Sequence, residues 1–109
     1  MWTIILGAIP NWEFPMSATF DEIHNLQEQA VFSAIAEIAS TYPHFDLDLM
    51  ADVGCVALNR VTPRYVRHTV DFTFYQTASE RERDQQMIDE AVRHAFEFVQ
   101  ARSAMRARA

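Results

Sequence analysis

The chain has no lysine, one cysteine and only two glycines among its 109 residues. A single cysteine excludes an internal disulfide and a multi-cysteine zinc site, and it fits a reducing compartment. Two glycines are too few for a glycine-rich phosphate loop. The four histidines show no metal-ligand spacing such as His-x-x-x-His. No serine nucleophile elbow or paired carboxylates stand out. We therefore predict a protein that is not an enzyme and that uses no metal or cofactor.

The totals predict one domain with a substantial core. Half of the residues are hydrophobic, including eight Phe and two Trp, and the length fits a single domain. The net charge of -6 disfavours general binding to DNA or RNA, which requires a basic face. Residues 1–9 are apolar but lack a positive flank and are too short to span a bilayer. We therefore expect a cytoplasmic protein that does not bind membranes.

Positive charge is absent from the first half of the chain and begins abruptly at one turn. No lysine or arginine precedes Arg60, and Arg64 and Arg67 follow closely, on either side of Tyr65 and after Pro63. Arginine stays ionised, binds phosphate or guanine through two parallel hydrogen bonds and stacks on planar rings. A turn of this composition is suited to a compact anionic ligand that carries planar bases.

Three helices are predicted from apolar spacing and capping patterns. The first covers residues 20–42, after the capping-box pattern Thr19-x-x-Glu22. The second covers residues 47–60, capped by Asp46 or Asp48. The third follows the pattern Ser79-x-x-Glu82 and continues to about residue 101 or beyond. Its apolar stripe contains Met87, Ile88, Ala91, Val92, Ala95, Phe96, Phe98 and Val99.

The second predicted helix is apolar on most sides, which is typical of a buried helix. Its polar residues Asp48, Asp52, Cys55 and Asn59 form one row, because their spacings of four, three and four follow the helical repeat. Two interpretations of this row remain open. Its partners are the backbone of the following turn or water, or the end near Asn59 opens onto a ligand.

Residues 66–75 alternate between apolar and polar side chains, which predicts a strand. His68 falls on the apolar face, so we expect a core histidine. A lone strand is unstable, so its partner is either the amino-terminal arm or the same strand of a second subunit, and we favour the second. The predicted fold is mainly α with a short β element: three principal helices plus one or two short strands. An apolar arm covers residues 1–19, the domain residues 20–101, and a frayed arginine-rich tail residues 102–109.

Two groups of residues resemble the late competence development ComFB-like family. One is the Asn-x-x-Glu-x-x-Val pattern of the first predicted helix, and the other is Ala-Leu-Asn followed by a proline turn and an aromatic residue. Thr62 stands where that turn usually has a proline. The resemblance covers about residues 20 to 100, and it is carried by Asn25, Glu28, Val31, Asp52, Cys55, Val56, Ala57, Leu58, Asn59, Pro63, Arg64, Tyr65 and 67–71.

The resemblance implies an intertwined homodimer that binds cyclic dinucleotides, chiefly cyclic di-GMP with cyclic di-AMP as a second possibility, and that signals without catalysis. Arg60, Arg64 and Arg67 would bind phosphates or guanine edges. Tyr65 would stack on a base. The residues expected to read base edges are Asn25, Asn59, and Asp52 or Glu28.

A second interpretation needs no nucleotide. In it the chain is a dimeric adaptor that holds another protein through the amino-terminal arm and the third predicted helix. The three arginines of the turn would then serve the end of the second helix and surface ion pairs. Neither interpretation identifies the downstream protein partner or the number of ligands per dimer.

Overall fold

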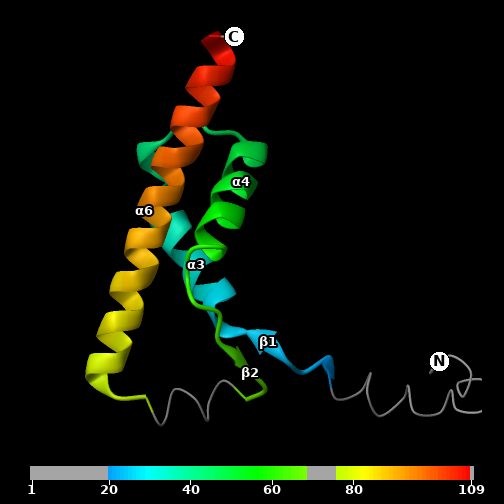
Figure 1. The fold of residues 1–109 in the computed structure, drawn as a ribbon, viewed down its shortest axis with the longest axis vertical. Coiled ribbons are helices and arrows are strands. Elements are labelled where there is room, and N and C mark those ends of the chain that lie inside the picture. The colour runs from blue at the N-terminus through cyan, green and yellow to red at the C-terminus, as the bar shows by residue number, and fades with distance from the viewer. Residues whose placement is uncertain (1–19, 69–75, 109) are drawn as a thin grey trace, which may run out of the picture.

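Three α-helices dominate the part of the chain that the structure describes. The computed structural model describes residues 20–68 and 76–108. Figure 1 shows α3 and α4 beside the middle of α6, whose last turns project beyond both. The prediction of three principal helices with short strands is confirmed. In chain order the elements are β1 (His24–Asn25), α3 (Leu26–Ile38), the 3-10 helix η2 (Ala39–Thr41), α4 (Leu47–Leu58), β2 (Tyr65–Val66) and α6 (Ala78–Arg108).

The core lies between one face of α6 and the two shorter helices. Val31 of α3 and Val53 of α4 are fully buried. The ring of Tyr42 stacks on Phe96 with 4.5 Å between ring centroids. The predicted stripe is largely confirmed, although Met87 is half-buried and Phe98 is exposed. The stripe residues that are buried are Ile88, Ala91, Val92, Ala95, Phe96 and Val99.

The first helix begins later than predicted. The α-helix starts at Leu26, where the Asn25 side chain accepts a hydrogen bond from the Gln27 amide and caps it. The capping box expected at Thr19 is therefore not the start of this helix, because the chain first forms a turn and the strand β1. The expected cap of α4 is confirmed, since Asp46 Oδ1 accepts from the Leu49 amide at 2.9 Å.

The start of α6 is also displaced from its prediction. Thr77 Oγ1 accepts from the Glu80 amide at 3.1 Å, and Glu80 Oε1 accepts from the Thr77 amide at 2.9 Å. This reciprocal pair is the capping box, two residues before the predicted one at Ser79. The helix then continues to Arg108. The tail expected to be frayed is therefore helical.

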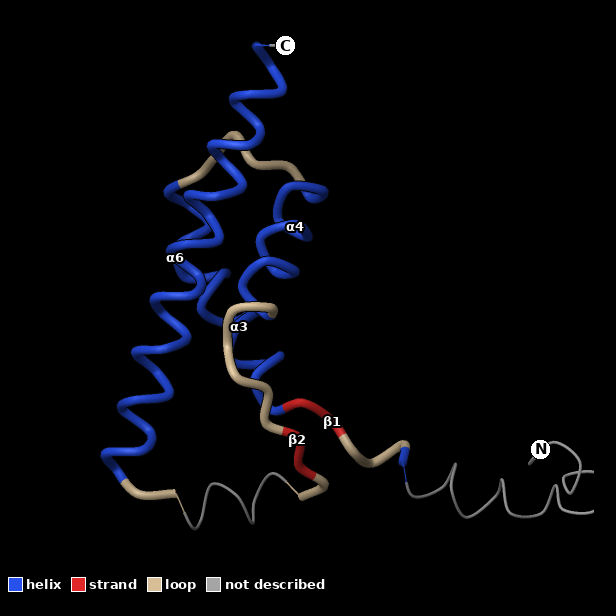
Figure 2. The backbone as a smooth tube through the Cα atoms, viewed as in Figure 1, coloured by secondary structure: helices blue, strands red, loops and turns tan. Residues whose placement is uncertain are grey.

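The strands β1 and β2 pair antiparallel over two residues each, as Figure 2 shows. His24 is opposite Val66, and Asn25 is opposite Tyr65. β2 shares only Val66 with the strand predicted at residues 66–75, so the partner expected for that strand stays a prediction. His68 is exposed rather than in the core. The segment 69–75 of the predicted strand and the arm 1–19 lie outside the described residues.

Helix α4 is less buried than its composition predicted. Val53, Gly54 and Ala57 are buried, but Leu47 is 87% exposed. The main packing partners of this helix among the described elements are α6 and α3, and part of α4 stays open in the single chain. The polar row lies at the edge of the contact with α6, where Cys55 and Asn59 are exposed and Asp52 is half-buried.

Candidate functional site

The turn between α4 and β2 is held against the start of α3 by backbone and side-chain hydrogen bonds. Asn25 Oδ1 accepts from the Arg64 amide at 2.8 Å and from the Gln27 amide at 3.2 Å. The Leu26 amide donates to the Arg64 carbonyl oxygen at 2.7 Å. One side chain thus caps a helix and fixes the backbone of the central arginine of the turn.

Gln27 fixes the same turn two residues earlier. Its side chain is buried, and Nε2 donates to the Thr62 carbonyl oxygen at 3.3 Å. A buried amide must find a partner, and this contact supplies one across 35 positions of the chain. The turn therefore stays anchored although Thr62 replaces the usual proline.

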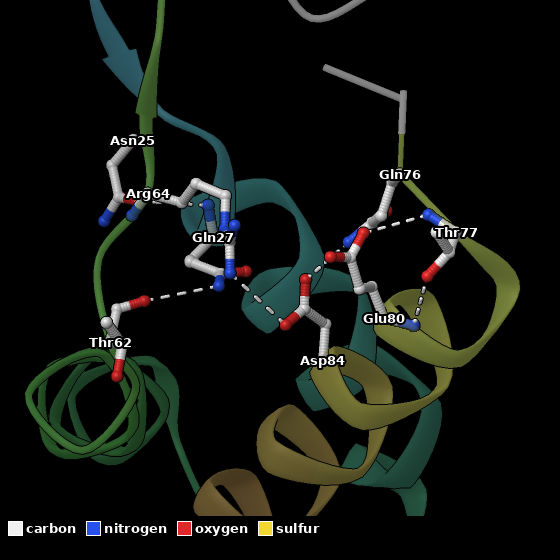
Figure 3. A network of polar contacts seen from close by, with 8 residues as sticks. All are labelled: Asn25, Gln27, Thr62, Arg64, Gln76, Thr77, Glu80 and Asp84. Carbon is white, nitrogen blue, oxygen red and sulfur yellow. Dashed lines mark hydrogen bonds and ion pairs between the residues drawn. The ribbon is translucent and has the colours of Figure 1, made fainter. Parts of the chain in front are cut away.

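The Arg64 guanidinium reaches from the turn to the start of α6. Figure 3 shows it directed at Asp84, with 3.4 Å between Nη2 and Oδ1. The other carboxylate oxygen of Asp84 accepts from Gln76 Nε2 at 2.7 Å. Both members of the ion pair are partly exposed, so the guanidinium is positioned but still open to solvent.

Tyr65 and Arg67 follow on β2. Tyr65 is 67% exposed, so its ring offers a face to a ligand. Arg67 Nε donates to Glu22 Oε1, and this hydrogen bond lowers the pKa of the Glu22 carboxyl below its ordinary value. Because both side chains are largely exposed, the pair contributes little to stability.

The remaining predicted residues occupy other places. Asn59 ends α4 and donates through Nδ2 to the Cys55 carbonyl oxygen at 2.9 Å. Asp52 forms an ion pair with Arg102 of α6 at 3.5 Å. Glu28 is exposed in the first turn of α3, where a negative charge favours the helix start.

A groove of about 360 Å³ runs between the end of α4 and the middle of α6. It contains two predicted residues, Asn59 and Arg60. Across from them are His94 and Phe98, whose rings stack with 6.0 Å between centroids. The lining is completed by Cys55 and Val56. We call it the α4–α6 groove.

The eight predicted residues therefore do not form one pocket within a single chain. Asn25, Arg64, Tyr65 and, next along β2, Arg67 gather at the turn, and we call them the turn set. Asn59 and Arg60 belong to the groove. The turn set reaches α6 at Asp84 and the groove reaches it at His94, ten positions later, which is about 15 Å of helix.

The turn set and the groove offer arginines, amides and exposed rings, which can bind anions and planar rings. Among residues 20–68 and 76–108, no group of three His, Cys, Asp or Glu side chains could hold a metal ion. Within the same ranges, no helix has both the length and the apolar character that crossing a membrane requires.

Comparison with known proteins decides the family. The family model described as Late competence development protein ComFB matches residues 24–103. The chain belongs to the ComFB family. The searches of curated proteins and of solved structures give no match. The ComFB match begins with β1 and ends within α6, so it contains both the turn set and the groove.

Sequence reasoning missed several residues that hold the turn set or line the α4–α6 groove within the ComFB match. Gln27 and Asp84 hold the turn, yet a glutamine in a helix and an aspartate near a helix start are ordinary surface residues. His94 and Phe98 were missed for a different reason. The apolar spacing of α6 assigned Phe98 to the core stripe, and nothing in the chain order pairs it with the end of α4.

Proposed function

We propose that the protein is a cytoplasmic, non-catalytic receptor for cyclic dinucleotides, chiefly cyclic di-GMP, that acts as a homodimer. Membership of the ComFB family supports the proposal, because the family resemblance implies this class of ligand. The observation that carries it is the anchored turn. Its backbone is fixed by Asn25, Leu26 and Gln27, while its arginine and tyrosine side chains remain accessible.

The turn set has the chemistry that a cyclic dinucleotide requires. Arg64 can bind phosphate oxygens or guanine O6 and N7 through its forked guanidinium. The exposed ring of Tyr65 offers a stacking face. Because Arg64 already lies against Asp84, little side-chain freedom is lost when it binds an anion, which favours affinity.

A dimer accounts for the exposed apolar side chains and for the separation of the predicted residues. Phe32 is 49% exposed on α3 and Leu47 is 87% exposed on α4. A second copy would cover such side chains. A two-fold assembly also offers each set of groups twice, which matches the two-fold symmetry of a cyclic dinucleotide.

Titration calorimetry tests the proposal directly. We expect heat of binding with cyclic di-GMP, and the same titration with cyclic di-AMP measures base preference. Arg64→Ala should weaken binding by about 1.5–3 kcal/mol, as for loss of a charged hydrogen-bond partner. Arg106→Ala is the matched control, because it removes the same charge from the exposed end of α6. Absence of heat with both nucleotides in the wild-type protein ends the proposal, and unchanged affinity of Arg64→Ala removes Arg64 from the site.

The adaptor function is the second candidate. One observation favours it: Met105 is 65% exposed on the last turns of α6, which project beyond the other helices. An exposed apolar helix face is a common protein-binding surface. An affinity pull-down with and without nucleotide separates the two functions, since an adaptor captures its partner equally in both conditions.

A further inference from the structure

The α4–α6 groove contains an aromatic ring, Phe98, that the hydrophobic core does not bury. Phe98 is 46% exposed, although its neighbours Phe96 and Val99 are buried. The His94 ring lies nearly parallel to it, with an angle of 24° between the planes. The groove has a volume of about 360 Å³, at the lower end of the range of small-molecule sites. Such a space fits one base with its phosphate better than two.

The charges beside the ring favour an anionic ligand. Arg60 lines the groove from α4. Arg102 extends from α6 so that its guanidinium carbon is 5.5 Å from the centroid of Phe98. The Asp52 carboxylate holds Arg102 at 3.5 Å. Asp52 offsets the charge of Arg102, so Arg60 supplies the positive charge for a planar anion beside the accessible ring.

We infer that the α4–α6 groove binds one purine base of the cyclic dinucleotide, which stacks on Phe98 and His94 while Arg60 binds the adjoining phosphate. This inference rests on the proposed function and adds to it a base-stacking wall contributed by α6. Stacking depends on the π face and tolerates different bases. The wall therefore contributes affinity for both guanine and adenine ligands, and Asn59 lies beside it to contact a base edge.

The wall differs from an ordinary solvent face of a helix because α4 lies opposite. His94, Phe98 and Arg102 are four positions apart, so they share one side of α6 by helical geometry alone. Arg60 and Asn59 close the other side of the same space. The concentration of guanidinium groups there argues for a nucleotide over a second copy of the chain, and the experiment below measures both.

The test compares two leucine substitutions in the full-length protein. Phe98→Leu keeps an apolar side chain but removes the stacking face. Phe20→Leu is the matched control, because that ring is similarly exposed, lies outside the groove and precedes the ComFB match. Calorimetry with cyclic di-GMP should show about 5- to 150-fold weaker binding for Phe98→Leu. Phe20→Leu should bind as the wild type does. Circular dichroism checks that each variant is folded.

A second measurement follows the groove in the wild-type protein. The ring-proton NMR signals of His94, assigned with a His94→Asn variant, should shift when cyclic di-GMP is added to the wild-type protein. Sedimentation without ligand shows whether Phe98→Leu alters the oligomeric state.

The outcomes distinguish the inference from the function on which it rests. Weaker binding by Phe98→Leu alone, together with shifted His94 signals, supports the inference. Equal affinity of Phe98→Leu and wild type overturns it and leaves the receptor function intact. The inference is also overturned if both leucine variants weaken binding equally, or if the His94 signals do not shift. Loss of the dimer in Phe98→Leu overturns it as well, because the groove would then be a subunit contact. Absence of cyclic dinucleotide binding in the wild type overturns the proposed function itself.

Discussion

Replacement of Asn25 by alanine should destabilise the protein by about 2 kcal/mol. The side chain has two separate duties, since Oδ1 accepts from the Gln27 amide at the start of α3 and from the Arg64 amide in the turn. Loss of a helix N-cap costs about 1 kcal/mol. Loss of the partner of the Arg64 amide costs about another 1 kcal/mol, since that contact is partly buried.

Two control variants test whether the Asn25 acceptor causes the loss of stability. Asn25→Asp keeps both acceptor duties and places a negative charge at a helix start, so its stability should stay within about 0.5 kcal/mol of wild type. Asn59→Ala removes only an exposed contact of the Asn59 side chain within α4, so its cost should be small. The comparison separates loss of an asparagine from loss of this particular acceptor.

Urea unfolding followed by circular dichroism measures these differences, at one fixed protein concentration because a dimer would make stability depend on it. The corresponding shift of Tm for Asn25→Ala is roughly 8–16 °C. An Asn25→Ala variant within about 0.5 kcal/mol of wild type would refute the reasoning. Equal destabilisation of Asn25→Asp and Asn25→Ala would also do so, because the acceptor would then not be the source of the effect.

Two further predictions concern helix starts and acid stability. Thr77→Ala should cost about 1 kcal/mol in thermal or urea unfolding, whereas Ser79→Ala should be near neutral; the reverse order would move the capping box back to its sequence-predicted place. The Thr77 amide lowers the pKa of the Glu80 carboxyl below its ordinary value of 4.5, and Arg67 does the same for Glu22. A depressed folded-state pKa stabilises the protein above the unfolded pKa, and this contribution disappears as pH falls through the folded value. Glu80→Gln should therefore reduce the loss of stability between about pH 5 and about pH 3; an unchanged acid slope would contradict this assignment.

Apolar periodicity predicted the helices well, because the buried residues of α6 are the apolar residues that recur at helical spacing in its sequence. The residues from Ile88 to Val99 that repeat at helical spacing are the ones that face the core. The cap of α4 was also predictable, since Asp46 directly precedes an apolar run. In both cases the decisive interactions are local or follow from one amphipathic face.

Helix boundaries were harder to predict because several capping patterns compete. Thr77-x-x-Glu80 and Ser79-x-x-Glu82 both satisfy the same rule, and the structure forms the first. Strands of two residues have no periodicity to detect, so the pairing of β1 with β2 was not predictable from pattern. His68 lies two residues beyond the end of β2 and is exposed, so the alternation counted from Val66 did not predict its position.

The arrangement of the candidate residues depended on helix packing, which sequence spacing does not encode. Asn25 and Arg64 lie together, and Asn25 Oδ1 accepts a hydrogen bond from the Arg64 backbone amide. Asn59 was grouped with them from the family resemblance and Arg60 from the arginine cluster, and both line the groove with His94 and Phe98. The turn set and the groove are separated along α6. That separation depends on how α6 packs against the other elements, which the order of residues in the chain does not show.

The hydrogen bond from the Arg64 amide to the Asn25 side chain joins residues 39 positions apart, and this affects the order in which the protein folds. Closing so long a loop costs entropy that only the packing of α3 against α4 and α6 can offset. We therefore expect the turn to form after the helices have packed together and to open before the core does. Exchange of the Arg64 amide hydrogen with deuterated water reports that opening separately from the opening of the core.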